Sequence, residues 1–181
     1  VTGYGQGQIL MSPLQLACYV SAYANNGKVM HPYVVDSVWH ANGTDYSFVY
    51  RNEPKVWRQL LQEATVETLL PALRSVCLDG TARYMSRSFI TRSPLTLGYT
   101  FAGKTGTAEI TDDKSRELAW FVCWRDTYTE NGQPVSDEDA RLVCVMLELN
   151  LVNGKIPSDT EISQMKYDIA RAILKDDVLN S

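Results

Sequence analysis

Three apolar runs in the second half of the chain predict the strands of one antiparallel sheet. The runs are residues 101–110, 119–125 and 142–150, and the last two carry almost no polar alternation. Strands that are covered on both faces have this uniform apolar character. Because the polar stretch between the second and third runs includes Asn131-Gly132, these two runs are expected to form a hairpin with a long tip.

Helical periodicity predicts a first helix that begins at Ser12 and stops at residues 25–27, Asn-Asn-Gly. The Ser12 hydroxyl can cap the helix, Pro13 fits its first turn, and Gln15 completes a capping box. Asparagine and glycine are typical of helix ends.

Two further helices are expected. An apolar stripe runs from Val66 to Cys77, with a kink predicted at Pro71 and the end of the helix at Asp79-Gly80. A second capping box, Ser158 with Glu161, opens a terminal helix. The fold class is therefore α+β, an antiparallel sheet with the C-terminal helix on one face. The core-facing stripe of that helix is predicted to be Ile162, Met165, Ile169, Ile173 and Leu174.

The segments between the helices carry their own signals. Residues 32–50 are expected to form a β-hairpin around Asn42-Gly43. Residues 85–97 carry arginines among serines and threonines and are interpreted as a surface loop that feeds the first sheet strand. The four tryptophans are assigned to the core or to domain packing, namely Trp39, Trp57, Trp120 and Trp124.

Composition and charge narrow the function classes. The 181 residues are 45% hydrophobic and 21% charged, which fits one ordinary folded domain over residues 1–181. A net charge of −4 without a basic run argues against nucleic acid or an anionic membrane surface as a partner. No apolar stretch approaches the length of a membrane span, and no signal peptide is visible. Because the chain opens at Val1 beside a glycine-rich segment, we expect it to be a piece of a longer protein.

The four cysteines, Cys18, Cys77, Cys123 and Cys144, each lie in an apolar run. Buried free thiols are the favoured interpretation, and a disulfide between Cys123 and Cys144 across neighbouring strands is the alternative. No cysteine or histidine pair has metal-ligand spacing, so neither a metal site nor a cofactor is predicted.

The candidate chemistry lies in the first sheet strand, Phe-Ala-Gly-Lys-Thr-Gly-Thr-Ala-Glu at residues 101–109. With the two-residue period of a strand, Thr105 and Thr107 share one face, while Lys104 and Gly106 lie on the other. Two hydroxyls and an ammonium group suit the binding of a carboxylate, and free backbone N–H groups at a sheet edge can receive an oxyanion. The alternative is a solvated edge strand whose lysine discourages aggregation.

Four local matches, in the same order along the chain, resemble the transpeptidase domain of penicillin-binding proteins. They are Gly-Tyr-Gly-Gln-Gly at 3–7 with Ser-Pro-x-Gln-Leu at 12–16, Tyr-Ala-Asn-Asn-Gly at 23–27, Gly-Lys-Thr-Gly-Thr-Ala-Glu at 103–109, and Ala-Trp-Phe-Val at 119–122. The chain resembles the C-terminal part of such a domain. The glycine–glutamine loop favours the class B, monofunctional group, and the sequence of this loop most resembles that of the low-affinity, resistance-type members.

The resemblance implies a role for each residue of the strand motif. Thr105 and Thr107 would bind the terminal carboxylate of the substrate or of a β-lactam, and the Thr107 N–H would form half of the oxyanion hole. Lys104 would keep the catalytic network electropositive, and Gly106 would leave room for the ligand backbone. Gln6 would line the same cleft.

The chain also departs from the family pattern. The family's nucleophile lies in Ser-x-x-Lys and its proton relay in Ser-x-Asn, both before the Lys-Thr-Gly strand. This chain has no Ser-x-Asn, and its only Ser-x-x-Lys, Ser163 to Lys166, lies in the terminal helix. Because Met165 is expected to face the core and Ser163 the solvent, that match is interpreted as coincidence. The whole protein is therefore expected to be a serine-type D,D-transpeptidase, and this chain alone is expected to be inactive.

The resemblance further implies partners and a location. The expected partners are peptidoglycan stem peptides ending in D-Ala-D-Ala, β-lactams, and the N-terminal half of the same protein, at the extracytoplasmic face of a bacterial membrane with an N-terminal anchor. The apolar edge strand 142–150 is expected to pair with a second copy in a homodimer, or to be shielded by a chain terminus. The alternative function is a noncatalytic β-lactam-sensing or scaffold domain, and a β-lactamase is disfavoured by the glycine–glutamine loop.

Overall fold

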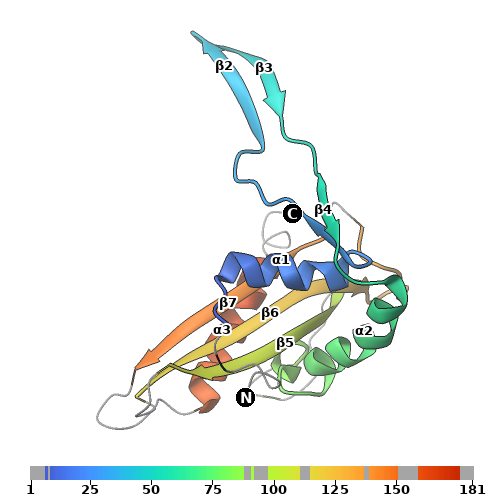
Figure 1. The fold of residues 1–181 in the computed structure, drawn as a ribbon, viewed down its shortest axis with the longest axis vertical. Coiled ribbons are helices and arrows are strands. Elements are labelled where there is room, and N and C mark those ends of the chain that lie inside the picture. Colours follow the sequence, from blue (N-terminus) through green and yellow to red (C-terminus); the bar gives the residue numbers. More distant parts are fainter. Residues whose placement is uncertain are drawn as a thin grey trace.

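The computed structural model describes residues 7, 9–87, 91, 98–110, 115–136, 139–150 and 159–175. This part of the chain contains three helices, seven strands and one 3-10 turn. Figure 1 shows their arrangement. In chain order they are α1 (Pro13–Ala24), β1 (Lys28–Met30), β2 (Ser37–Asn42), β3 (Asp45–Arg51), β4 (Val56–Gln59), α2 (Glu63–Leu78), η2 (Arg83–Met85), β5 (Tyr99–Glu109), β6 (Arg116–Tyr128), β7 (Leu142–Asn150) and α3 (Asp159–Lys175).

The main sheet has the order β5-β6-β7, and both pairings are antiparallel. The register places Lys104 opposite Val122, and Val122 opposite Cys144. The predicted strand order and the α+β fold class are therefore confirmed. Strand β7 has the predicted bounds, whereas β6 is longer than predicted, because it begins at Arg116 and continues to Tyr128 beyond its apolar centre.

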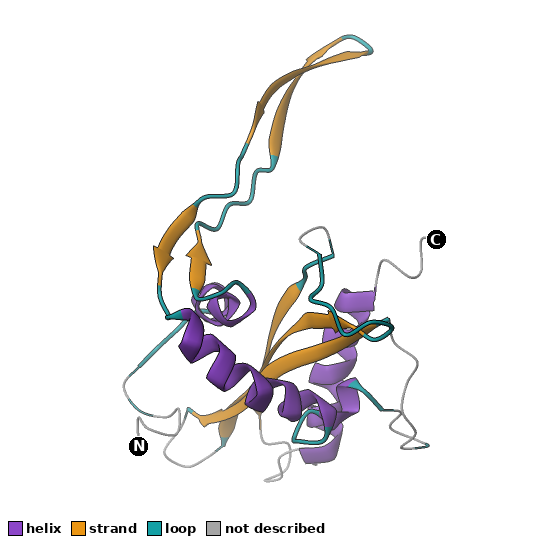
Figure 2. Cartoon of the chain, turned by 90° about the vertical axis from the view of Figure 1, so that its right-hand side faces the viewer, coloured by secondary structure: helices purple, strands orange, loops and turns teal. Residues whose placement is uncertain are grey.

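Helices cover both faces of this sheet, which explains the uniform apolar runs of β6 and β7 (Figure 2). One face packs against α3, where Phe121 and Cys123 join the fully buried Tyr167 and Leu174. The opposite face packs against α1 and α2 in a second cluster. The members of that second cluster are Val20, Ala102, Val122 and Trp124, with Leu16, Tyr23, Leu70, Leu73, Leu142 and Cys144 packed against them.

Helix α1 begins and ends as predicted. The Ser12 hydroxyl accepts a hydrogen bond from the Gln15 N–H at 3.2 Å, and the Gln15 side chain accepts from the Ser12 N–H at 2.8 Å. After Ala24 the chain turns through left-handed conformations, with φ of 47° at Asn26 and 81° at Gly27. A Cβ at Gly27 would lie 2.0 Å from the Leu61 carbonyl oxygen, so glycine is required there by space as well as by φ.

Helix α2 is confirmed and runs through Pro71 from Glu63 to Leu78. The amide groups of Asp79 and Gly80 both donate to the Ser75 carbonyl oxygen, at 3.1 and 2.8 Å, and close the helix where the sequence predicted.

The predicted buried stripe of α3 is correct at Ile169 and Leu174 and wrong at Met165 and Ile173, and the Ile162 side chain lies outside the described residues. Met165 is 55% exposed and Ile173 is 51% exposed, whereas Lys166 and Tyr167 are buried. The prediction counted aliphatic residues only. The Tyr167 ring instead determines the orientation of the helix, because it packs edge-on against Phe121 with 4.9 Å between the ring centroids.

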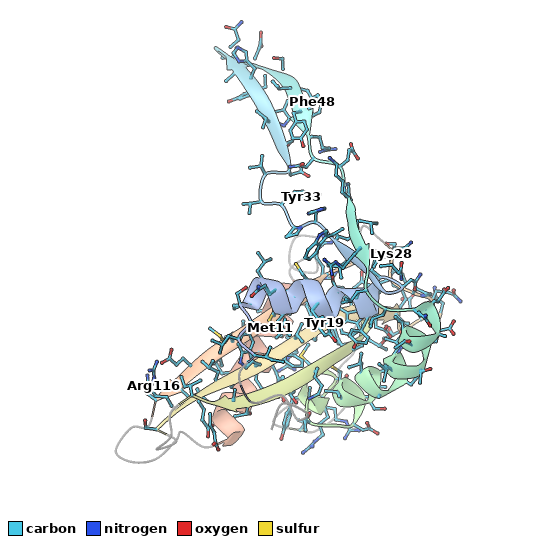
Figure 3. The ribbon with its side chains drawn as sticks, in the orientation of Figure 1. Met11, Tyr19, Lys28, Tyr33, Phe48 and Arg116 are labelled. Carbon is cyan, nitrogen blue, oxygen red and sulfur yellow. The ribbon has the colours of Figure 1, made fainter. Side chains whose placement is uncertain are left out.

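The hairpin predicted at residues 32–50 is confirmed as β2 and β3, but its first strand begins at Ser37 rather than at Tyr33. The hairpin projects from the rest of the molecule as an arm, defined here as residues 31–55, with Tyr33 near its base and Phe48 further out (Figure 3). The short strands β1 and β4, which were not predicted, pair with each other at the base of the arm.

Assignment to the core is correct for two of the four tryptophans, and domain packing by the other two is not tested by the described residues. Trp124 is 3% exposed and Trp120 is half-buried within the sheet. Trp39 and Trp57 are 52% and 53% exposed and lie outside the core, because the arm has no layer packed over it in the described part of the chain. Trp39 instead packs edge-on against Phe48 across the hairpin.

Two other predictions are resolved by burial. The surface loop expected at residues 85–97 is wrong at its start, since Met85 is fully buried under α3, and residues 88–90 and 92–97 lie outside the described residues.

All four thiols are free. Cys123 and Cys144 belong to clusters on opposite faces of the sheet, so the alternative of a disulfide between them is wrong.

Candidate functional site on strand β5

Strand β5 is an end strand of the main sheet, with β6 on one side and no strand on the other among the described residues. Its central residues keep regular register, with Thr105 opposite Phe121 and Thr107 opposite Ala119. Lys104 and Thr107 are exposed, and Thr105 is half-buried. The edge position that the sequence analysis assumed is therefore present.

The alternation of side chains along β5 agrees with the predicted faces. Thr105 lies opposite Phe121, a member of the cluster under α3, whereas Lys104 lies opposite Val122, a member of the cluster under α1. The Lys104 ammonium group donates to the carbonyl oxygen of Thr105 at 2.6 Å. The charge is thereby held close to the strand.

The surroundings of Gly103 and Gly106 differ in whether they leave space for a side chain. A Cβ at Gly103 would lie 2.6 Å from the Val122 carbonyl oxygen, so this glycine permits the close approach of β5 to β6. A Cβ at Gly106 would meet only the Trp120 Cβ at 3.6 Å, an ordinary contact. Packing within the described chain therefore does not demand glycine at position 106.

Thr81 joins the site from another element, and sequence reasoning gave it no role. Its hydroxyl oxygen lies 3.0 Å from the hydroxyl oxygen of Thr105, although the two residues are 24 positions apart. The Tyr167 hydroxyl of α3 donates to the Thr81 carbonyl oxygen at 2.9 Å. The one available signal was a threonine placed directly after the helix stop at Gly80.

Two charged residues of β6, the strand next to β5, are buried: Arg125 and Asp126. Arg125 is 3% exposed, donates to the carbonyl oxygen of Leu174 at the end of α3, and lies over the Tyr99 ring at 4.6 Å. The neighbouring Asp126 forms an ion pair with Arg74 of α2. These contacts connect β6 to α2 and α3. They give the buried charges of Arg125 and Asp126 the polar partners that burial requires.

The described part of the chain does not place Gln6, Ser163 or the two histidines at β5. Gln6 lies outside the described residues, as does the side chain of Ser163 in α3. His31 packs against the Trp57 ring at the base of the arm, and His40 lies in β2, so neither reaches β5. The described residues contain no group of three or more side chains that could hold a metal ion.

An apolar groove lies between α1 and the base of the arm, and no residue of β5 lines it. Two of its lining residues are labelled in Figure 3, Met11 just before α1 and Tyr19 within it. Its other lining residues include Pro32, Trp57 and Leu60.

Comparison with known families identifies the chain. The model of the penicillin binding protein transpeptidase domain matches residues 1–135, which include α1, α2, β5 and β6. The chain belongs to this family. The transpeptidase resemblance read from the motifs is therefore confirmed.

Among curated relatives, the chain is similar to penicillin-binding protein 3 of Bacillus subtilis (strain 168), with 34% identity over 133 residues. The match covers 67% of the chain but only 16% of the relative. The chain thus spans about a sixth of the length of that relative, and it is a portion of a D,D-transpeptidase domain.

Solved structures agree with the fold. The D,D-transpeptidase domain of a peptidoglycan glycosyltransferase from Eggerthella lenta matches with a TM-score of 0.55 and 28% identity, over 78% of this chain and 28% of that one. Penicillin-binding protein A from M. tuberculosis, solved as a penicillin G acyl-enzyme complex, matches with a TM-score of 0.55 and 22% identity. That second match covers 79% of this chain and 27% of the other.

Within the part of the chain that the structure describes, no helix is both long enough and apolar enough to cross a bilayer.

Proposed function

We propose that this chain is the substrate-binding portion of a peptidoglycan D,D-transpeptidase that cross-links cell-wall stem peptides by serine acyl transfer. In this proposal residues 1–181 are the C-terminal portion of the transpeptidase domain. The observation that carries it is the placement of Lys104, Thr105 and Thr107 on an end strand of the sheet in a chain of this family.

The proposed ligand group is the terminal carboxylate of a D-Ala-D-Ala peptide or of a β-lactam. A carboxylate only accepts hydrogen bonds, and the hydroxyls of Thr105 and Thr107 can each donate one. Hydrogen bonds to a charged group contribute about 1.5–3 kcal/mol each, so two hydroxyls are enough for a specific subsite. The positive charge of Lys104 favours an anion at this strand.

The remaining roles concern the reacting carbonyl. The Thr107 N–H is proposed as one donor of the oxyanion hole, and Gly106 as the place where the ligand backbone lies against β5. Gln6 is proposed to line the same cleft from the glycine-rich segment. A fixed donor of this kind stabilises the negative charge that develops on the carbonyl oxygen in the transition state.

The nucleophile is proposed to come from a part of the protein outside this chain. Its serine oxygen attacks the carbonyl carbon of the penultimate D-Ala, the C–N bond breaks, and the terminal D-Ala leaves as its amine takes up the proton. The acceptor amine of a second stem peptide then displaces the serine oxygen and forms the cross-link. The same serine would be acylated by β-lactams.

The location and partners follow from this function. A peptidoglycan substrate places the protein at the extracytoplasmic face of a bacterial membrane, with an anchor outside this chain. The N-terminal half of the domain is proposed as the direct partner of β5, because it would supply the nucleophile to the open side of this strand.

The binding role is tested by titrating the chain with diacetyl-Lys-D-Ala-D-Ala and following backbone amide signals by NMR. Thr105→Val and Thr107→Val are each expected to weaken binding by roughly tenfold or more, because each removes a donor to a charged group. Thr68→Val is the matched control, since the Thr68 hydroxyl donates to Ala64 within α2. Unchanged binding by both variants of β5 would contradict the proposal.

A further inference from the structure

The hydroxyls of Thr81 and Thr105 share a hydrogen bond, and the protein alone does not fix which of the two is the donor. The Thr81 and Thr105 oxygens lie 3.0 Å apart, and either hydroxyl can be the donor. Each hydroxyl has a single proton and two acceptor lone pairs. The direction of this hydrogen bond therefore determines whether the Thr105 proton is free for a ligand.

Thr81 is held firmly enough to act on its neighbour. Its carbonyl oxygen accepts from the Tyr167 hydroxyl at 2.9 Å, and Tyr167 itself is 1% exposed. The next residue, Ala82, is fully buried and its N–H donates to the Val76 carbonyl oxygen at 2.9 Å. Helices α2 and α3 thus fix the Thr81 backbone from two sides.

We propose that Thr81 is a positioning residue that donates its hydroxyl proton to Thr105, so that the Thr105 proton points at the ligand carboxylate. The inference rests on the proposed function, in which Thr105 binds that carboxylate. Because a carboxylate offers no proton, Thr105 must donate to it and can then only accept from Thr81. A hydrogen bond received by Thr105 also strengthens the one that it donates, since hydrogen bonds in a chain polarise one another.

This arrangement differs from a structural role of Thr81 in one measurable way. A hydroxyl that merely stabilises the turn after α2 would affect every ligand of β5 equally. A hydroxyl that directs the Thr105 proton matters for a ligand that needs this proton. The effect should therefore depend on the charge of the ligand terminus and on the presence of the Thr105 hydroxyl.

The experiment compares Thr81→Val with Thr81→Ser in the NMR titration with diacetyl-Lys-D-Ala-D-Ala and with its C-terminal amide. Thr81→Val is expected to weaken binding of the carboxylate ligand by roughly three- to tenfold, the range for one hydrogen bond. Thr81→Ser is expected to restore it, and the amide ligand is expected to bind both variants as it binds the unmodified chain. In a Thr105→Val background, Thr81→Val should have no further effect.

The outcomes separate this inference from the proposed function. If the unmodified chain binds the carboxylate ligand and Thr81→Val binds it equally well, the positioning role is overturned and the binding role of β5 stands. Equal weakening for the carboxylate and the amide also overturns it, in favour of a structural role. If the unmodified chain shows no binding, the proposed function fails and this inference fails with it. Thr81→Ala serves as the second hydroxyl deletion if Thr81→Val does not fold.

Discussion

Cys77 and Cys123 lie in the same buried cluster between the sheet and α3. Burial raises the pKa of the Cys77 thiol to about 12, and the negative charge of Asp126 contributes in the same direction. Burial likewise raises the pKa of Cys123 well above its usual value. Since the thiolate is the nucleophile, neither residue is reactive while the protein is folded.

Alkylation by iodoacetamide at pH 8 is therefore expected to modify Cys18 first. Cys18 is half-buried in the groove beside the arm, whereas Cys77 and Cys123 should react only after unfolding. A rise of pH from 8 to 10 should leave Cys77 unmodified, because its thiol is still protonated there. Peptide mapping by mass spectrometry checks this order, and equal rates for Cys18 and Cys77 would contradict it.

The sequence identified the motif residues of β5 but not Thr81, which lies beside them. Lys104, Thr105 and Thr107 could be predicted because they are adjacent in one strand, where the period of two assigns their faces. The contact of Thr105 with Thr81 could not, since it depends on how α2 ends relative to β5. No local pattern encodes that distance.

Helix α3 shows how an element can be predicted correctly and oriented wrongly. The amphipathic period gave the helix, but two neighbouring aliphatic residues, Ile173 and Leu174, were both assigned to the core. Leu174 is 1% exposed, while Ile173 is 51% exposed. Tyr167 and the stem of Lys166 occupy the buried side in place of Met165. A stripe that includes a tyrosine and a lysine is not recognisable from aliphatic residues alone.

The orientation of α3 predicts opposite outcomes for two matched substitutions. Leu174→Ala is expected to lower the free energy of unfolding by about 2–5 kcal/mol, because it leaves a cavity in the core. Ile173→Ala is expected to change it by less than about 1 kcal/mol, because that side chain is half in solvent. Urea denaturation of both variants measures the difference. A larger loss for Ile173→Ala than for Leu174→Ala would mean that α3 is rotated.

The other elements divide in the same way. The capping box of α1, the stop after α2 and the strands β5 to β7 were predictable because their signals are local. The pairing of β1 with β4 was not, since each strand is short and they are separated by the whole arm. The sequence also could not decide between core and domain packing for Trp39 and Trp57, because large aromatic residues ordinarily indicate a core.

For the molecule as a whole, incubation of this chain with a fluorescent penicillin is expected to give no stable covalent adduct. Acylation needs a serine with a base within hydrogen-bond reach. The only Ser-x-x-Lys is in α3, where Lys166 is 4% exposed and its ammonium group lies 5.4 Å from the centre of the Tyr167 ring. Intact mass spectrometry checks this, with a complete penicillin-binding protein as the positive control. Stoichiometric labelling, especially at Ser163, would overturn the interpretation of that motif.

The second whole-molecule prediction is association through β7. Among the described residues β7 has a neighbour only on the side of β6, so the other edge offers unpaired backbone groups. The apolar side chains of β7 do not themselves require a partner, because Val143 and Val145 are 8% and 6% exposed beneath α3. What is left open is the backbone edge itself. Antiparallel pairing of β7 with β7 of a second copy would extend the sheet across a two-fold axis.

A homodimer of this kind is expected to dissociate on dilution, and sedimentation velocity over a wide concentration range measures it. Met146→Lys is the matched variant, because Met146 lies in β7 with a side chain that is 40% exposed, and a lysine there disfavours edge-to-edge pairing. The variant should shift the equilibrium toward monomer without loss of the folded sheet signals. A single monomeric species at every concentration would show that the chain closes its own edge, and pairing through β7 would then be wrong.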